Sequence, residues 1–354
     1  MGFHGARNPW RYDVNDKPVF GYWFGFGSWR LLLAILVALS HLWSGMIDGY
    51  AAYAVWGFFV LSGYLMTYVL RNKYGFEAAG LRAYAYNRFI RIMPTYYLAV
   101  MFGVVTLLAL RHSVELTRLN PQFAMPHGHQ WLNPLTLLPV FTGSNLPVPV
   151  SGALATEVGM YLLMPFMARS RSSAWLALVL GLVANASVGF GAHTFPTRYT
   201  HFETCLFAFA AGSLTGHYIE SLRRFARPAL ALGVWMAHGL VWLKWDSWPW
   251  HYGLCFSVLL SAWVVVSLDA RRNSGLDKLL GDWSYPVYLF HTVVAAWLLP
   301  WFGYGRPLNF FLLAFVLTIA VSWLVVVVLD RPLARLKRPG LRVLSAEKDN
   351  PPPL

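Results

Sequence analysis

The chain has 354 residues, of which 57% are hydrophobic, 17% aromatic and only 12% charged. Soluble globular proteins carry about 25% charged residues, so this composition excludes an ordinary water-soluble fold. The formal net charge of +13 is compatible with a polyanion-binding surface, but also with the basic loops of a multi-spanning membrane protein. The distribution of the 28 basic residues along the chain decides between these two classes.

Stretches of roughly 20 mostly apolar residues, long enough to cross a bilayer, recur along the chain. We therefore predict an all-α, polytopic integral membrane protein with about ten transmembrane helices. Residues 1–28 contain no apolar signal-peptide region, so the first span is expected to insert the chain. The predicted spans are 31–48, 52–70, 93–110, 152–168, 174–192, 202–220, 229–245, 251–268, 284–302 and 308–329.

Most basic residues fall in alternate connections between these spans. One set of connections, which includes both termini, holds 23 of the 28, and the positive-inside rule places that set in the cytoplasm. The charge surplus is therefore mainly a signal of topology, and no nucleic-acid partner is expected. The opposite side is predicted to carry the long connection 112–151. The five basic residues of that side are Arg111, Arg118, Arg198, Lys244 and Arg306.

The first span carries ionisable residues, which are costly inside a bilayer unless they are paired or hydrated. His41 follows Arg30 by eleven residues, which in a helix brings both to within about 20° of one face, separated by about 16 Å. Arg30 would then lie at the cytoplasmic rim and His41 near mid-membrane, with Asp48 on the same stripe at the outer rim. The alternative for His41 is a structural histidine hydrogen-bonded to a neighbouring helix.

Arg88 and Arg91 are three residues apart and shortly precede Pro94, which we expect in the first turn of the third span. Two guanidinium groups beside the positive end of a helix dipole would form a site for a phosphorylated anion. The alternative is simple positive-inside anchoring, which is the interpretation we give to Arg71, Lys73 and Arg82.

Two further ionisable residues lie inside later spans. Glu157 is expected to need a partner such as His41 or a substrate hydroxyl, and His291 lies about seven residues into the ninth span. A packed, hydrogen-bonded histidine is the alternative for His291. Cys205 and Cys255 lie in separate spans and predict inert thiols. No metal site is predicted, since His127 and His129 have no acidic residue nearby.

Taken together and in this order, these residues resemble the membrane-bound acyltransferase-3 family of bacterial O-acyltransferases that modify surface sugars. The resemblance covers most of the chain, but Val158 replaces the second Glu of the family's Glu-Glu pair and Val293 replaces a Pro after the late His. The segments that carry it are the Arg30 and His41 pair, Phe58 to Thr67, Arg88 and Arg91 with Pro94, Ala155 to Pro165, Ser284 to His291, and Asp330 to Pro332.

The resemblance implies a membrane domain over residues 29–332, between a cytoplasmic segment 1–28 and a disordered cytoplasmic tail 333–354. It implies a stand-alone form, without a hydrolase-like domain, in the bacterial inner membrane. The expected reaction transfers an acyl group, most simply acetyl, from cytoplasmic acyl-CoA to a carbohydrate hydroxyl. O-antigen, exopolysaccharide and glycolipid acceptors all remain open, as do acyl groups other than acetyl.

The chemistry of the residue types suggests a role for each. Arg30, Arg88 and Arg91 would bind the phosphates of the coenzyme, and His41 would act as the base, by direct transfer or through an acyl-histidine. Glu157 would assist His41 or the acceptor, and Asp48 and His291 would support the site. The competing hypothesis is an exporter of a glycan or lipid-linked sugar that performs no acyl transfer.

Overall fold

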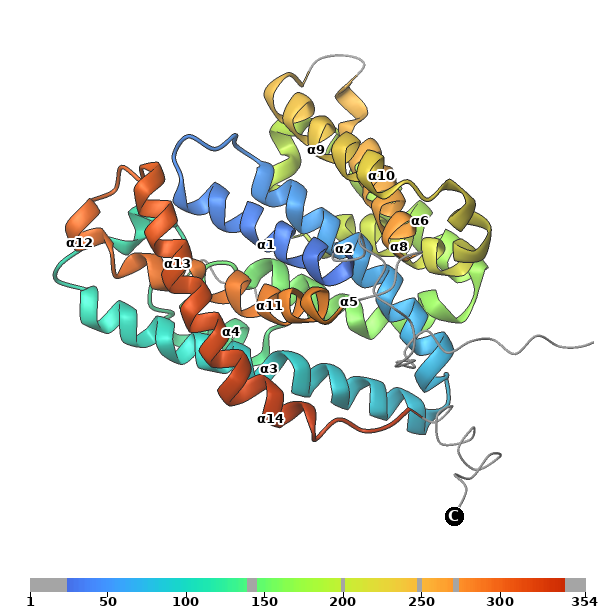
Figure 1. The fold of residues 1–354 in the computed structure, drawn as a ribbon, viewed down its shortest axis with the longest axis horizontal. Coiled ribbons are helices and arrows are strands. Elements are labelled where there is room, and N and C mark those ends of the chain that lie inside the picture. The colour runs from blue at the N-terminus through green and yellow to red at the C-terminus, as the bar shows by residue number, and fades with distance from the viewer. Residues whose placement is uncertain (1–23, 139–144, 199–200, 247–249, 270–273, 341–354) are drawn as a thin grey trace, which may run out of the picture.

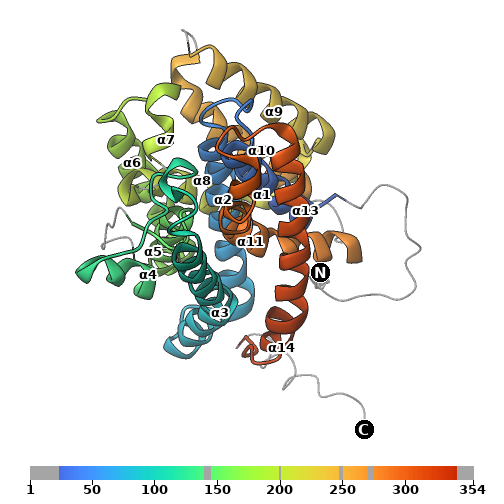
Figure 2. The same ribbon diagram turned by 90° about the vertical axis from the view of Figure 1, so that its left-hand side faces the viewer.

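The computed structural model describes residues 24–340, except 139–144, 199–200, 247–249 and 270–273. These described residues form helices and no strand, as the all-α prediction requires (Figures 1 and 2). Ten helices have 16 residues or more, and each overlaps one of the ten predicted apolar spans. They are α1 Phe26–Leu42, α2 Tyr50–Val69, α3 Ala78–Leu110, α5 Ser151–Arg169, α6 Arg171–Ala186, α8 Phe202–Leu222, α9 Pro228–Lys244, α10 Gly253–Asp269, α11 Gly275–Ala296 and α13 Leu308–Val325.

Three helical segments in the described part of the chain are long and apolar enough to cross a membrane, namely Tyr50–Tyr74, Ala78–Leu110 and Leu308–Ala334. Several of the other helices are apolar but shorter, so the count of ten membrane crossings stays a prediction. The three segments differ in position. In its most apolar window, the α2 segment has 72% of its residues buried, against 28% for the α13 segment. Helix α2 is therefore central and α13 peripheral.

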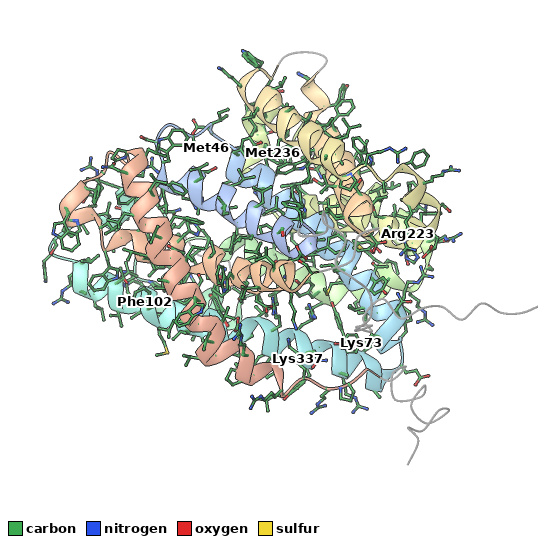
Figure 3. The ribbon with its side chains drawn as sticks, in the orientation of Figure 1. Met46, Lys73, Phe102, Arg223, Met236 and Lys337 are labelled. Atoms are coloured by element: carbon green, nitrogen blue, oxygen red, sulfur yellow. The ribbon has the colours of Figure 1, made fainter. Side chains whose placement is uncertain are left out.

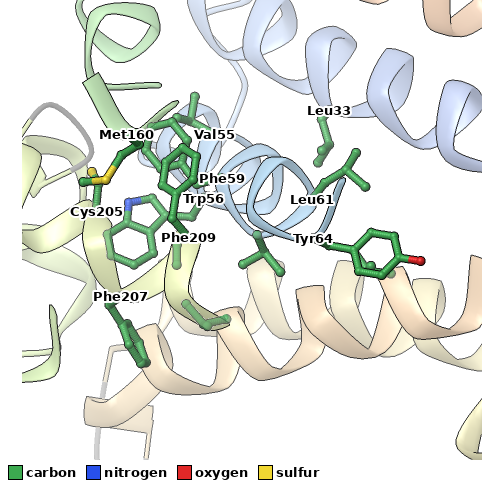
Figure 4. Packing of buried hydrophobic residues seen from close by; sticks show 14 of the residues in the cluster. Leu33, Val55, Trp56, Phe59, Leu61, Tyr64, Met160, Cys205, Phe207 and Phe209 are labelled. Carbon is green, nitrogen blue, oxygen red and sulfur yellow. The ribbon is translucent and has the colours of Figure 1, made fainter. Parts of the chain in front are cut away.

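The core is built around α2, which packs closely against α8. Gly63 of α2 and Gly212 of α8 allow the two backbones to approach, because a Cβ atom at Gly212 would lie 2.0 Å from the carbonyl oxygen of Val60. Beside this crossing, the rings of Phe59 and Phe209 stack with centroids 4.9 Å apart (Figure 4). Small residues thus set the helix spacing and aromatic rings fill the adjoining space.

A second close crossing joins α1 to α11, where the backbone of Gly27 meets Gly281. Here the buried carboxylate of Asp277 accepts hydrogen bonds from the backbone N–H groups of Gly25, Gly27 and Ser28, at 2.8 to 3.0 Å, and from the Ser28 hydroxyl at 2.7 Å. The first N–H groups of a helix lack partners within it, so Asp277 acts as the N-terminal cap of α1 from another helix. This cap fixes the direction in which α1 runs.

Two predicted boundaries are corrected by the structure. Helix α1 ends at Leu42, earlier than the predicted span 31–48, because the next residue, Trp43, adopts an extended backbone with φ of −124° and ψ of 117°. Helix α3 begins at Ala78, so Pro94 lies inside it and not in its first turn. A proline is tolerated inside an apolar helix when neighbouring groups satisfy the freed backbone.

The C-terminal part of the described chain folds back onto α3. After the short helix α14, Arg331–Ala334, the backbone of Arg338 forms two hydrogen bonds with the side-chain amide of Asn87. Arg338 N donates to Asn87 Oδ1 at 2.8 Å, and Asn87 Nδ2 donates to Arg338 O at 2.9 Å. The guanidinium of Arg338 also lies over the ring of Tyr86, 4.3 Å from its centroid. Residues up to Gly340 in the expected disordered tail therefore have defined contacts. Residues 341–354 of that tail and 1–23 of the predicted N-terminal segment lie outside the described residues.

Candidate active site

The centre of the candidate site is a pair of histidines that face each other from α1 and α11. His41 Nδ1 lies 2.9 Å from His291 Nε2, and the two rings stack with centroids 5.2 Å apart. His291 is fully buried, whereas His41 is partly exposed in the last turn of α1. His41 is the second-last residue of α1, and its expected depth near mid-membrane stays a prediction.

The backbone of α11 determines the tautomers of this pair. His291 Nδ1 faces the carbonyl oxygens of Tyr288 at 2.8 Å and Val287 at 3.2 Å, and because carbonyls only accept, Nδ1 must carry a proton. In a neutral imidazole, Nε2 of His291 is then the acceptor, and His41 must donate from Nδ1. The remaining nitrogen, His41 Nε2, keeps its lone pair and has no hydrogen-bond partner among the described residues.

His41 also lines a cavity of about 30 Å³ at this end of α1. The walls come from α1, α2, the start of α5 and the residues before it, from Tyr288 of α11, and from the connection after α3, which contributes Asn120 and Gln122. Arg306 donates a hydrogen bond of 2.9 Å to the carbonyl oxygen of His41. A cation at this carbonyl stabilises the C-terminal end of α1 and holds the backbone of His41 in place.

The predicted donor-binding arginines gather at the opposite end of α1. Arg30 lies close enough to Arg91 and Arg88 for their charges to act on it. Desolvation, together with the positive charges of Arg91 and Arg88, lowers the pKa of Lys337, which marks this residue as a fourth member. We call Arg30, Arg88, Arg91 and Lys337 the basic cluster. Figure 3 shows Lys337 beside α3, on the far side of the molecule from Met46, which follows the end of α1.

Within the basic cluster the arginines are only partly neutralised. Arg91 forms a long ion pair with Asp282 at 3.7 Å, and Nε of Arg88 is buried without a hydrogen-bond partner in the described part of the chain. Because Arg88 and Arg91 lie in the middle of α3, the predicted contribution of a helix N-terminus at these residues is wrong. Their positive charge comes from the side chains alone.

Glu157 belongs to the basic-cluster end of the site and does not contact His41. Its carboxylate accepts hydrogen bonds from the hydroxyl of Ser62, at 2.6 Å, and from the hydroxyl of Tyr161. Its charge also acts on Arg30. Of the two partners expected for Glu157, His41 is not hydrogen-bonded to it, since His291 takes that position, and a substrate hydroxyl stays a prediction.

Asp48 is likewise separated from the histidine pair. It lies, exposed, in the connection between α1 and α2, with no hydrogen bond or ion pair to any described residue. The predicted helical stripe required α1 to continue through residue 48, and α1 ends at Leu42. Among the described residues there is also no group of three or more His, Cys, Asp or Glu side chains that could hold a metal ion.

Several residues at the site escaped the sequence analysis. Asp277 could have been noticed, because it follows Ser274 by three residues, as in the cap at the start of a helix. Its second role, capping α1, could not have been predicted from the residues around it. Lys337 and Arg306 had been counted only as loop charges. Asn120 and Gln122 stand in a polar connection with nothing in their spacing to single them out.

The described residues form apolar helices with a histidine pair at one end of α1 and a cluster of cations at the other, an arrangement that fits the class of membrane-associated group-transfer enzymes. The acyltransferase domain family matches residues 23–327, which is most of the chain. The chain therefore belongs to the acyltransferase-3 family, as its motifs predicted. Comparisons with curated proteins and with solved structures gave no match.

Proposed function

We propose that this acyltransferase moves an acyl group, most simply acetyl, from acyl-CoA to a hydroxyl group of a carbohydrate. The observation that carries the proposal is the contact of His41 Nδ1 with His291 Nε2, since the tautomers it implies leave the lone pair on Nε2 of His41, a residue that lines a cavity. Imidazole exchanges protons near neutral pH, so this nitrogen suits general base catalysis.

In the proposed reaction, His41 Nε2 accepts the proton of the acceptor hydroxyl while that oxygen attacks the thioester carbonyl. The carbon–sulfur bond then breaks, and the imidazolium returns the proton to the departing thiolate. In the variant with a covalent intermediate, the same nitrogen attacks the thioester carbonyl and the carbon–sulfur bond breaks, which releases the thiolate. The acceptor hydroxyl then attacks the acyl-imidazole, the carbon–nitrogen bond breaks, and the hydroxyl proton passes to the thiolate. Both routes need the Nε2 lone pair, and His291 holds it in position.

The basic cluster is the proposed site for the phosphates of the donor. Arginine binds phosphate oxygens through paired hydrogen bonds, and Arg88 Nε has no hydrogen-bond partner among the described residues. Arg30 and His41 lie on one uninterrupted helix, about 16 Å apart along its axis, a length that the extended arm of a coenzyme A thioester covers. Glu157, with Ser62 and Tyr161, would fix the position of Arg30.

The setting of this reaction follows from the charge distribution along the chain. The segments that contain the basic cluster are those the positive-inside rule assigns to the cytoplasm, where acyl-CoA is available. The histidine pair would then open toward the outer face of a bacterial inner membrane. An O-antigen, an exopolysaccharide or a glycolipid presented there would serve as acceptor.

The experiment is the substitution His41→Ala, assayed with purified protein, acetyl-CoA and a surface-glycan extract. We expect transfer to fall by about 10²- to 10⁴-fold or to the detection limit, which is the usual loss when an acid–base group is removed. The amount of protein in the membrane should not change. Wild-type transfer in the variant would refute the assignment. A wild-type protein that never consumes acetyl-CoA without a gradient would favour the exporter hypothesis.

A further inference from the structure

The cavity beside His41 has a lining of distinctive chemistry. Its polar side chains include His41 and the two carboxamides of Asn120 and Gln122, and its apolar wall includes Ala51 and Val55 of α2. Among the residues that the structure describes, no Asp, Glu, Lys or Arg side chain lines it. A charged group entering such a cavity would lose its hydration without gaining a partner of opposite charge.

The two carboxamides have free hydrogen-bonding capacity. Asn120 Oδ1 accepts a bond of 3.0 Å from the backbone of Gln122, but Asn120 Nδ2 and the whole side-chain amide of Gln122 have no protein partner in the described part of the chain. The backbone around them is fixed, because Leu146 N donates to Gln122 O at 2.7 Å and Phe123, which follows Gln122, is buried. Side-chain amides without protein partners on a fixed backbone are preorganised for binding, because less conformational freedom is lost when a ligand binds.

Building on the proposed function, we propose that Asn120 and Gln122 form the acceptor subsite, which takes an uncharged hydroxyl-bearing group and presents its oxygen to His41 Nε2. Amides both donate and accept hydrogen bonds, as the hydroxyl groups of a sugar do. A cavity of about 30 Å³ holds one or two water-sized groups, so it fits a hydroxymethyl arm and not a whole ring. The ring would remain outside the cavity.

The test measures ligand protection of a cysteine in the cavity and needs no turnover. Ala51→Cys is made in a Cys255→Ser background, where the remaining Cys205 is buried, and its alkylation by a maleimide is timed on the purified full-length protein. The matched control is Ala124→Cys, which is in the same loop as Gln122 but does not line the cavity. The probes are methyl glucoside, which is neutral, and methyl glucuronide, which carries a carboxylate in place of the hydroxymethyl group.

We expect methyl glucoside to slow alkylation of Ala51→Cys at least threefold and methyl glucuronide to leave it unchanged. Adding Gln122→Ala should remove the protection, and Ala124→Cys should respond to neither sugar. Absence of protection by the glucoside, or equal protection by the glucuronide, would overturn the proposal. If the glucoside protects while the wild-type protein consumes no acyl-CoA, the subsite stands and the proposed function fails.

Discussion

The backbone of α11 determines which ring nitrogen of His41 carries the proton. The carbonyl groups of Tyr288 and Val287 require His291 to donate from Nδ1, and His291 in turn requires His41 to donate from Nδ1. A residue that only supported the fold could be replaced by any side chain of similar size. A residue that sets a tautomer can be replaced only by another hydrogen-bond acceptor.

This distinction gives a prediction for His291. His291→Leu removes the acceptor and should lower acyl transfer by about 10²- to 10⁴-fold, because the base would lose its orientation and tautomer. His291→Gln keeps a side-chain carbonyl that can accept from His41 Nδ1, so it should retain activity within about tenfold of wild type. The turnover number of both purified variants is the measurement. Equal activities for the Leu and Gln variants would contradict a positioning role.

The basic cluster makes a separate prediction about the donor. Replacing Arg88 and Arg91 together by Gln should raise the acyl-CoA concentration needed for half-maximal rate by tenfold or more, since each charge-assisted hydrogen bond contributes about 1.5–3 kcal/mol. Arg82→Gln is the control, because Arg82 is exposed on the same helix and bonds only to Ala78 O at 3.3 Å. An unchanged acyl-CoA dependence in the double variant would remove the phosphate-binding role.

At the residue scale, the sequence predicted which groups matter better than it predicted their partners. His41, His291 and the arginines were recognisable because ionisable groups in apolar helices are rare. Their pairing depends on how α1, α2, α5 and α11 pack, which spacing along one chain does not encode. His41, one of the two partners expected for Glu157, is therefore bonded to His291 instead, and the position of Asn120 and Gln122 in the cavity wall had no sequence signal at all.

At the scale of helices, the close packing of α2 against α8 limits the size of the side chain at two glycine positions of α8 to different degrees. Both Gly212 and Gly216 lie on the face of α8 toward α2. A Cβ atom at Gly212 would meet the backbone oxygen of Val60 at 2.0 Å, whereas one at Gly216 would meet the side chain of Thr67 at 3.1 Å. Backbone cannot move aside without shifting the whole helix, but a side chain can adjust.

We therefore expect Gly212→Ala to destabilise the protein far more than Gly216→Ala. Overpacking that shifts a backbone costs about 1–3 kcal/mol or more, while the second change should cost less than about 1 kcal/mol. Thermal unfolding of the detergent-solubilised variants, followed by tryptophan fluorescence, measures the difference. Similar midpoints for the two variants would show that the α2–α8 spacing is not fixed by these glycines.

The predicted helices lie at the expected positions because runs of apolar residues identify them. Two of their boundaries were wrong, because apolar composition does not show where a helix begins or ends. Pro94 is a frequent first-turn residue, so its position suggested a start for α3 about fifteen residues too late. The end of α1 was misplaced because the residues after Leu42 are still partly apolar. Neither boundary could be corrected without knowing which groups of neighbouring helices satisfy the backbone.

At the scale of the whole molecule, the two halves of the proposed reaction lie at opposite ends of α1. The basic cluster surrounds Arg30, near the end that Asp277 caps, and the histidine pair and cavity lie at the end that Arg306 contacts. A donor and an acceptor could then approach from different sides of a bilayer and meet at His41. That arrangement is useful only if the two ends of α1 face different compartments.

The orientation can be tested with two introduced cysteines, each made separately in a Cys255→Ser background in which the remaining Cys205 is buried. His129→Cys lies in the connection after α3, on the side of the histidine pair, and Glu77→Cys lies just before α3, near the basic cluster; both positions are exposed. The 23-to-5 distribution of basic residues predicts that the first lies outside and the second inside the cell. A membrane-impermeant maleimide should therefore label His129→Cys in intact cells and Glu77→Cys only after permeabilisation. The reverse pattern would put the basic cluster on the side that lacks acyl-CoA, and the proposed transfer across the membrane would then be impossible.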